Sequence, residues 1–297
     1  MSRAGAVLVV LLASYVAYCL IDTFDPETVR GKTVLVTGSS SGIGEQLAYH
    51  YARLGANVVV TGRRENLLKK VVARCNELSG KQVHKYVVAD MNRMDEVEKF
   101  TESTFNGKLD VLMLNHGYNE LLELWTGHQD NLTMHERVMN TNFMSHVFLA
   151  SRLMPLLEKS SGRIGVTSSI LGVIPMPFVA SYSSSKHALS SFFSALRMDL
   201  VLQGSSVSIT NGIVGSTATE RHVSELKKYI GRPDIPFATG TPEDVAMALL
   251  KATMLRQSEV FAPWLPALSF IRILRVIAPD LADYVIRYGE QSLRQGN

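Results

Sequence analysis

A tyrosine and a lysine four residues apart, Tyr182 and Lys186, are candidates for proton transfer in this sequence. On a helix, side chains at this spacing lie on the same face. A free tyrosine has a pKa near 10, so it is a poor proton carrier at neutral pH. An ammonium group about 4–5 Å from the phenol favours the phenolate by about 3–4 kcal/mol at an effective dielectric constant of about 20, which lowers the pKa by about 2–3. The spacing therefore predicts a tyrosine that exchanges protons near neutral pH.

Two more polar residues precede this pair and could supply hydrogen bonds at the reacting centre. Ser169 ends an apolar run that predicts a strand over residues 163–169, thirteen residues before Tyr182. Its hydroxyl could hold a substrate oxygen while Tyr182 exchanges a proton with that oxygen. Asn142 lies in a predicted helix over residues 133–157, where a buried asparagine is usually hydrogen-bonded packing. A tyrosine and a lysine at this spacing often occur by chance. The interpretation therefore depends on the elements that position these residues.

Residues 33–44 predict a strand, a glycine turn and the start of a helix, and the rest of the chain is organised around this unit. It begins with a short apolar run of β-branched residues, which is typical of a strand buried on both faces. The run breaks at Gly38, and a helical pattern begins after Gly44. In dinucleotide-binding folds such a turn holds a pyrophosphate at the helix N-terminus. The spacing is G-x-x-x-G-x-G rather than G-x-G-x-x-G, and an ordinary strand-to-helix turn is the alternative interpretation.

The chain resembles the short-chain dehydrogenase/reductase family, whose loop T-G-x-x-x-G-I-G stands here at residues 37–44. The resemblance spans residues 31–262. It implies an α/β fold, a doubly wound Rossmann-type parallel sheet of about seven strands with helices on both faces. It also implies hydride transfer with a nicotinamide cofactor, in which the lysine holds ribose hydroxyls and the asparagine fixes a water. The family's catalytic set matches here in order and at compatible separations, at Asn142, Ser169, Tyr182 and Lys186.

Two arginines follow the second predicted strand, residues 57–61. An acidic residue at this position takes the ribose hydroxyls of NAD, whereas arginine accommodates the 2′-phosphate of NADP. Arg63 and Arg64 can form forked, charge-assisted bonds to a phosphate, which predicts NADP(H) as the cofactor. Alternatively, both arginines open a solvated helix, with Glu65 as an ionic partner. Ser41 departs from the family pattern, because many NADP-preferring relatives carry a basic residue there.

The resemblance further implies which residues contact the cofactor. The turn after the fourth predicted strand is N-N-A-G or N-A-G in the family, so His116 is a variant. Val214 replaces a proline that the family usually carries after the sixth strand. The implied contacts are Gly38, Ser39, Ser40, Ser41, Gly42, Ile43, Gly44, Arg63, Arg64, Asp90, Met91, Asn115, His116, Gly117, Tyr182, Lys186, Gly215, Thr217 and Thr219. No metal ligands are assigned.

The remaining pattern alternates strands with helices, which indicates a parallel α/β sheet. Residues 220–229 are typical of a lid helix over the substrate, and Thr241 followed by Pro242 is a well-formed helix start. Further strands are predicted at residues 83–88, 109–114, 207–214 and 259–262, and further helices at 65–78, 95–105, 182–202 and from 242 to about 256.

The first residues form an apolar segment that precedes the predicted catalytic domain. Residues 4–21 carry no charge, and about eighteen residues is at the short end of what spans a bilayer. Arg3 precedes the segment and acids follow it, so the positive-inside tendency places the main domain in the lumen. We expect an uncleaved anchor, and a cleaved secretory signal is the alternative. A glycosylation sequon at Asn131 is compatible with a lumenal domain but is common by chance.

The sequence therefore divides into an N-terminal anchor or signal peptide (1–24), a dinucleotide-binding catalytic domain (25–262) and an apolar C-terminal extension (263–297). The extension is too charged to span a bilayer. It predicts an amphipathic segment that lies on a membrane surface, covers the substrate mouth, or forms core or dimer contacts. The formal net charge of +3 and the lack of a basic stripe argue against a nucleic-acid partner.

Within the family, the anchor, the arginine pair and Asn115-His116 make the chain resemble the 11β-hydroxysteroid dehydrogenase type 1 and type 1-like group. The resemblance implies NADP(H) use, a lumenal domain anchored in the endoplasmic reticulum membrane, and a homodimer formed through helices 133–157 and 182–202. It implies a lipophilic substrate, in the first place a steroid, held by Ser169, Leu171, Met176 and Tyr182. If the N-terminal segment is cleaved, the protein is instead secreted.

Two rival functions remain open at this point. The apolar loop over residues 170–179 would also accept a retinoid or another lipid or xenobiotic carbonyl, because Met176 offers no steroid-specific hydrogen bond. A nucleotide-sensing scaffold without turnover is a more remote alternative. Its expected mark is a lost tyrosine or lysine, and both Tyr182 and Lys186 are present.

Overall fold

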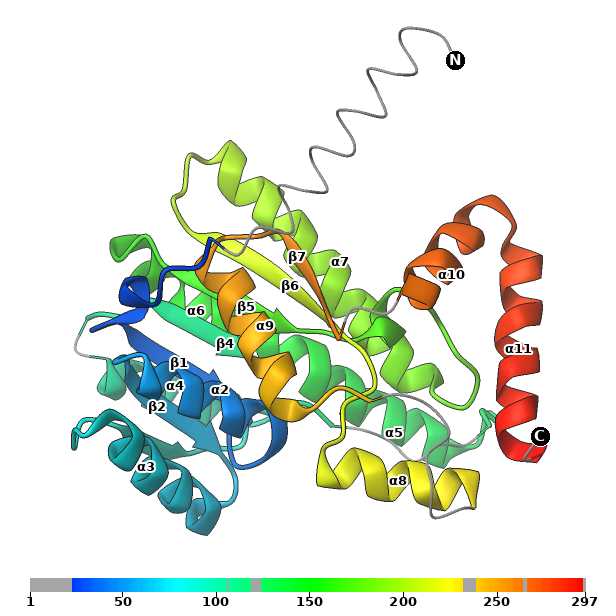
Figure 1. The fold of residues 1–297 in the computed structure, drawn as a ribbon, viewed down its shortest axis with the longest axis horizontal. Helices are drawn as coiled ribbons and strands as arrows, with labels where there is room; N and C mark the ends of the chain where they lie inside the picture. Colours follow the sequence, from blue (N-terminus) through cyan, green and yellow to red (C-terminus); the bar gives the residue numbers. More distant parts are fainter. Residues whose placement is uncertain (1–22, 106, 119–123, 232–238, 264–265, 296–297) are drawn as a thin grey trace, which may run out of the picture.

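A seven-stranded parallel sheet forms the centre of the computed structural model, which describes residues 23–105, 107–118, 124–231, 239–263 and 266–295. The strand order is β3-β2-β1-β4-β5-β6-β7, and each neighbouring pair is parallel (Figure 1). The predicted doubly wound sheet is therefore confirmed. The strands are β1 (Thr33–Thr37), β2 (Asn57–Gly62), β3 (Lys85–Val88), β4 (Val111–Leu114), β5 (Arg163–Thr167), β6 (Ser208–Val214) and β7 (Glu259–Ala262).

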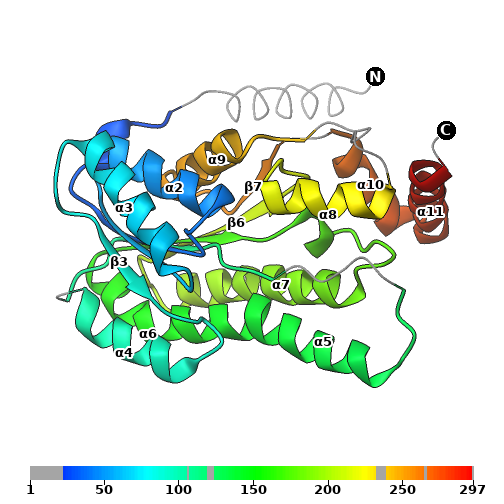
Figure 2. The same cartoon turned by 90° about the horizontal axis from the view of Figure 1, so that it is seen from below.

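Helices cover both faces of this sheet (Figure 2). One core cluster joins it to α2 (Gly42–Arg53), α3 (Glu65–Ser79) and α9 (Pro242–Met254). The other joins it to α4 (Met94–Thr104), α6 (Ser145–Lys159) and α7 (Ala180–Leu202). The further helical elements are η1 (Pro26–Val29), α5 (Gln129–Met139), η2 (Asn140–Met144), η3 (Ile170–Gly172), α8 (Glu220–Ile230), α10 (Pro266–Ile277) and α11 (Pro279–Gln295).

Strand β1 shows why the central strands are apolar at every position. Val34 and Val36 are completely buried in the cluster that contains α2, whereas Leu35 is buried in the cluster on the opposite face. Successive side chains of a strand point to opposite faces, so a sheet covered on both sides needs apolar residues throughout. This packing explains why a short continuous apolar run, rather than an alternating one, identified the strand.

The long helix predicted over residues 133–157 differs from the structure in two ways. It begins earlier, at Gln129, and ends at Lys159. It also contains a π-helical turn, η2, at Asn140–Met144, where one extra residue widens the helix. The hydrophobic periodicity gives no sign of this turn, because the residues on either side keep a helical pattern.

The two ends of the chain bear on the membrane predictions. The predicted N-terminal anchor or signal lies outside the described residues. Among the residues that the structure does describe, no helix is both long enough and apolar enough to cross a bilayer. The C-terminal extension forms α10 and α11, two helices at the end of the molecule that carries α8 (Figure 1).

Gly38 provides a direct test of the turn between β1 and α2. Its φ is +63°, and a Cβ atom placed on it would lie 2.6 Å from the backbone Cα of His116. We expect Gly38→Ala to lower the free energy of unfolding by about 2–5 kcal/mol, from left-handed backbone strain of about 1–2 kcal/mol and overpacking of about 1–3 kcal/mol. Urea denaturation followed by circular dichroism measures this change.

Gly80 is the matched control, because its φ is +66° and an added Cβ would meet nothing within 4 Å. Gly80→Ala should show only the strain, about 1–2 kcal/mol. Equal losses in the two variants would contradict the close packing of the turn against His116.

Candidate active site

Tyr182 and Lys186 lie in the first two turns of α7, at the edge of the sheet where β5 ends. The Nζ atom of Lys186 is 5.8 Å from the centroid of the Tyr182 ring, so the structure brings the predicted pair together. Lys186 is only 4% exposed, and its Nζ donates a 3.0 Å hydrogen bond to the carbonyl oxygen of Thr167. A cation is thus held in the protein interior with a backbone carbonyl as hydrogen-bond acceptor.

Burial controls the proton affinity of both groups. It lowers the pKa of Lys186 to about 8, because an ammonium loses its hydration in the interior. It raises the pKa of Tyr182 to about 12, and a hydrogen bond with Ser169 offsets only part of this effect. The predicted lowering of the tyrosine pKa is therefore wrong in direction. The physical reason is that desolvation of the phenol outweighs its other interactions, and the ammonium is directed at Thr167.

A phenol with a raised pKa is suited to donating a proton rather than to accepting one. At neutral pH Tyr182 keeps its proton, so it is a donor for an oxygen that becomes more basic than a phenolate during the reaction. Ser169 is 7% exposed, and its hydroxyl accepts from the amide of Leu171 at 3.1 Å. The hydrogen bond between Ser169 and Tyr182 shows that the predicted serine and tyrosine meet.

Asn142 lies at the π-helical turn η2 and is completely buried. Its Oδ1 accepts from the amide of Tyr118 at 2.7 Å, and its Nδ2 donates to the Tyr118 carbonyl at 2.9 Å. The same Nδ2 donates to the hydroxyl of Ser185 at 3.1 Å. Asn142 therefore connects the chain after β4 to α7. Its contact on α7 is Ser185, the residue that precedes Lys186. The π-turn places the asparagine where it reaches both elements.

The turn after β4 is tied to the end of β1 through Thr37. The Thr37 hydroxyl accepts from the amides of Asn115 (2.9 Å) and His116 (3.2 Å). One ring nitrogen of His116 lies 2.8 Å from that hydroxyl, and the other lies 2.7 Å from the hydroxyl of Ser145. The ring also stacks on His146, with centroids 3.8 Å apart. Burial lowers the pKa of His116 to about 3, so this histidine is neutral and serves as packing rather than as a base.

The glycine turn is tightly packed at its base. A Cβ on Gly44 would lie 2.5 Å from both the Asn115 side chain and the Gly38 carbonyl oxygen. The Ser39 hydroxyl is buried and accepts from the amide of Thr61 at 3.0 Å, so it joins this turn to β2. Ile43 packs against the core below. These residues shape the turn from inside the fold.

The outer side of the turn carries Ser40 and Ser41, and Arg64 reaches both. One guanidinium nitrogen, Nη2, lies 2.7 Å from the Ser40 hydroxyl and 2.8 Å from the Ser41 hydroxyl. Arg63 is exposed beside it, and α2 begins at Gly42. A helix N-terminus and an exposed guanidinium therefore stand at one corner, which is a suitable environment for phosphate.

The other predicted contacts lie around the same edge of the sheet. A Cβ on Gly117 would meet Asn142 Oδ1 at 3.5 Å and Lys186 Nζ at 3.9 Å, and one on Gly42 would meet the Thr219 methyl at 3.1 Å. Asp90 caps its own turn by accepting from the amide of Asn92 at 3.0 Å. Met91 and Thr217 are buried, and Gly215 and Thr219 follow β6 at the start of α8.

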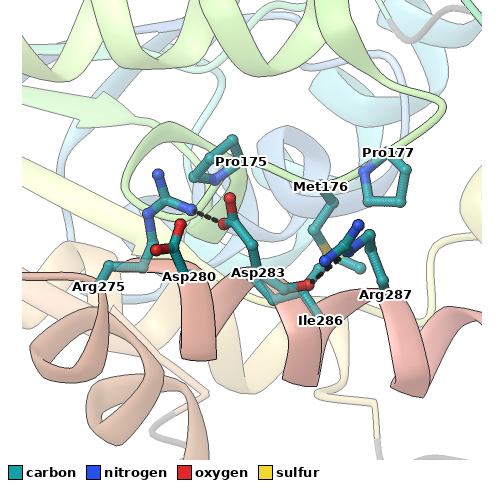
Figure 3. A pocket seen from close by; sticks show the side chains of 8 residues that line it. All are labelled: Pro175, Met176, Pro177, Arg275, Asp280, Asp283, Ile286 and Arg287. Carbon is teal, nitrogen blue, oxygen red and sulfur yellow. Dashed lines mark hydrogen bonds and ion pairs between the residues drawn. The ribbon is translucent and has the colours of Figure 1, made fainter. Parts of the chain in front are cut away.

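The predicted substrate residues occupy different positions on the loop after β5. Leu171 lies next to Ser169, in the turn η3. Met176 instead lines an open cavity of about 510 Å³ between this loop and the C-terminal helices (Figure 3). Its other lining residues are Pro175, Pro177, Arg275, Asp280, Asp283, Ile286 and Arg287.

Several residues near the site carried no recognisable sequence signal. Arg221 and Glu225 of α8 form an ion pair at 2.8 Å and act on the proton affinity of Tyr182. Two guanidinium groups lie over the Tyr118 ring, that of Arg137 at 4.5 Å and that of Arg221 at 5.5 Å from its centroid. The contacts of Tyr118 join separate elements, so no local spacing could indicate them.

Comparison with known proteins defines the class. The short chain dehydrogenase family matches residues 32–229, and the chain belongs to that family. It is 41% identical over 257 residues to the hydroxysteroid 11-beta-dehydrogenase 1-like protein of Xenopus tropicalis, covering 86% of this chain and 87% of the relative. The protein is therefore an oxidoreductase acting on CH–OH groups, similar to the 11β-hydroxysteroid dehydrogenase 1-like group.

Two solved structures share the fold. A short-chain dehydrogenase from Escherichia coli in complex with NADPH is similar with a TM-score of 0.71 and 25% identity, over 81% of this chain and 100% of the other. One from Shigella flexneri in complex with NADP has a TM-score of 0.70 and 25% identity, over 80% and 98%.

The buried ammonium of Lys186 leads to a prediction about stability and pH. Its folded pKa of about 8 lies below the value of about 10.4 in an unfolded chain. Below pH 8 both states are charged and the folded state bears the whole burial penalty. Between pH 8 and about 10.4 the unfolded state binds more protons, so stability rises with pH.

We therefore expect Lys186→Met to raise the free energy of unfolding at pH 7 by about 2 kcal/mol, the burial penalty less the hydrogen bond lost at Thr167. The advantage over the wild type should shrink by pH 9.5. Urea denaturation at both pH values measures it, with the exposed Lys70→Met as control. An advantage that is absent at pH 7, or equal at both pH values, would contradict the buried charge.

Proposed function

We propose that this protein is an NADP(H)-dependent oxidoreductase that interconverts a hydroxyl and a ketone on a lipophilic substrate, in the first place a steroid. The observation that carries the proposal is the phenol of Tyr182, hydrogen-bonded to Ser169, with the Nζ atom of the buried Lys186 5.8 Å from the centroid of its ring. The names of the relatives support a steroid as the substrate. The apolar loop, with Leu171 close to Ser169 in the chain, supports a lipophilic substrate.

The residues present fit the cofactor. Helix α2 begins at the glycine turn and offers free N–H groups to a pyrophosphate. Arg64, held by Ser40 and Ser41 at that turn, supplies a cation that could bind a 2′-phosphate. This arginine compensates for the absence of a basic residue at Ser41. NADP(H) is accordingly the cofactor, and when bound its nicotinamide supplies or accepts the hydride.

The chain's own groups would act on the substrate oxygen. Ser169 donates a hydrogen bond that orients the oxygen, and Tyr182 gives its proton to the alkoxide that forms during reduction. The Lys186 ammonium stabilises the negative charge left on the phenol in the dry site, where electrostatic interactions are strong. Asn142 holds the chain at Tyr118 and joins it to Ser185 on α7.

A second candidate is the same chemistry on a retinoid or another lipid or xenobiotic carbonyl. The observation that favours it is the position of Met176, which faces the C-terminal helices and offers no steroid-specific hydrogen bond (Figure 3). A non-catalytic nucleotide-sensing scaffold is the more remote alternative. The meeting of Ser169, Tyr182 and Lys186 supports turnover over this alternative.

We also propose that the protein is anchored in the endoplasmic reticulum membrane with its catalytic domain in the lumen, and that it is a homodimer. Residues 4–21 support the anchor by their composition. Exposed apolar residues on α10 and α11, such as Phe270, Ile273 and Tyr284, support contact with the membrane surface. The sequon offers no support for a lumenal domain, because Asn131 is only 8% exposed and accepts hydrogen bonds from Thr126.

The cofactor preference is tested at Arg64. Arg64→Gln should lower the ratio of kcat/KM with NADPH to kcat/KM with NADH about 10- to 100-fold, because a forked, charge-assisted contact to the 2′-phosphate is lost. Steady-state kinetics with the two cofactors measure the ratio. Arg74→Gln on α3 is the control, since Arg74 pairs with Glu77 on its own helix. An unchanged ratio in Arg64→Gln would show that Arg64 does not select the cofactor.

The activity is tested with purified protein, NADPH and a panel of steroid and retinoid ketones and aldehydes. We expect turnover of at least one steroid ketone, and a loss of about 10³-fold or more in kcat in Tyr182→Phe. The affinity of that variant for NADPH, measured by fluorescence, should remain within about twofold. Inactivity on every steroid would refute the steroid assignment, and unchanged turnover in Tyr182→Phe would refute the mechanism.

A further inference from the structure

The C-terminal helix α11 contacts two segments that surround the proposed substrate site. Through Ile286 and Arg287 it lines the cavity whose opposite wall is the loop at Met176 (Figure 3). It also lies next to the C-terminal end of α8, the predicted lid, to which it is hydrogen-bonded (Figure 2). The Met176 loop follows Ser169 in the chain. Helix α8 carries Arg221 and Glu225, which act on the proton affinity of Tyr182.

Contacts at both ends hold α8 in place. At its N-terminal end, Arg221 lies over the ring of Tyr118, whose backbone is bonded to Asn142. At its C-terminal end, the Tyr229 ring packs against Phe178, with centroids 5.6 Å apart and an interplanar angle of 63°. The helix therefore spans the site from the turn after β4 to the loop after β5.

Phe178 has an unusual backbone conformation at this contact. Its φ is +69°, in the left-handed region that residues other than glycine rarely adopt. Such strain persists only where the surrounding structure maintains it, and it is concentrated at clamps and functional sites. Here the structure that maintains it includes the Tyr229 ring, so the position of α8 and the shape of the loop are linked.

The hydroxyl of Tyr229 connects this assembly to α11. It donates a 2.9 Å hydrogen bond to Oε2 of Glu290, across sixty-one residues of sequence, and both side chains are half-buried. A phenol that donates to a carboxylate makes a charge-assisted bond, which is stronger than one between neutral groups. The C-terminal extension is thereby bonded to the lid helix itself.

We propose that Tyr229 and Glu290 are positioning residues, through which the C-terminal helix holds α8 closed over Tyr182 and controls the entry of the lipophilic substrate. Helix α11 then acts as an outer wall of the substrate site. The inference rests on the proposed function only for its kinetic readout, because the position of α8 can be measured without substrate.

Two single variants and their combination test the proposal in the full-length protein. Tyr229→Phe removes the hydroxyl and keeps the ring against Phe178, and Glu290→Ala removes the acceptor. Tyr284→Phe is the control, because Tyr284 is an exposed tyrosine of the same helix that stacks on Tyr288. Hydrogen exchange of residues 220–230, followed by mass spectrometry, reports how often α8 opens.

We expect this segment to exchange about 3- to 10-fold faster in each single variant, the change that loss of one hydrogen bond of about 1 kcal/mol implies. The double variant should be no faster than the singles, since all three lack the same bond. In the same variants KM for the substrate should rise by a similar factor, while the affinity for NADPH remains that of the wild type. In the control variant Tyr284→Phe, residues 220–230 should exchange at the wild-type rate.

Exchange that is unchanged in both single variants, or single effects that multiply in the double variant, would overturn the proposal. A wild-type protein without turnover on any substrate would contradict the proposed function instead. The exchange experiment would still decide whether α11 holds the lid, so the two failures are distinguishable.

Discussion

The site depends on one constraint, the burial of the Lys186 ammonium in the interior of the protein. An isolated charge in such a position is costly, and it persists only where hydrogen bonds and geometry compensate for lost hydration. The carbonyl of Thr167 at the end of β5 provides one such bond, at 3.0 Å. Tyr182 lies one helical turn before Lys186 on α7. The bond between Lys186 and Thr167 therefore also helps to fix the position of the Tyr182 phenol.

The neighbouring segments keep this arrangement in position. Asn142, at the π-turn of the long helix, binds the backbone of Tyr118 on one side and the Ser185 hydroxyl on the other. Thr37 ties the turn after β4 to the end of β1, and so to the glycine turn that begins α2. These hydrogen bonds, together with the short chain segment over residues 115–118, therefore link the proposed cofactor corner to the proposed proton donor. The stacked, neutral His116 and His146 fill the space beneath it.

Much of the fold could be predicted from sequence because local patterns determine it. Apolar β-branched runs identified the strands, and the glycines around Gly38 identified the turn into α2. The spacing of Tyr182 and Lys186 correctly placed both on one helical face. Their pKa values could not be predicted, because the sign depends on how much water burial removes. The π-turn at Asn142 was likewise hidden, because the residues on either side of it keep a helical pattern.

The contacts of α8 show the same limit more clearly. Residues 220–229 were identified as a lid, yet nothing in their sequence indicates that Arg221 would lie over Tyr118 or that Tyr229 would bond to Glu290. Arg64 was predicted to contact phosphate, and the structure adds that two serines of the glycine turn hold it. Such pairs join elements far apart in the chain, so only the assembled fold reveals them.

The ionisation of Lys186 tests this account most directly. In protein labelled with ¹³C at the lysine ε-carbons, the resonance of Lys186 can be assigned by its disappearance in a lysine-substituted variant and followed by NMR from pH 6 to 11. The account predicts that this resonance titrates near pH 8, below the value of about 10.4 for a lysine in an unfolded chain. Titration of Lys186 at about 10.4, the value for an unfolded chain, would show that its charge is hydrated and would contradict the central claim.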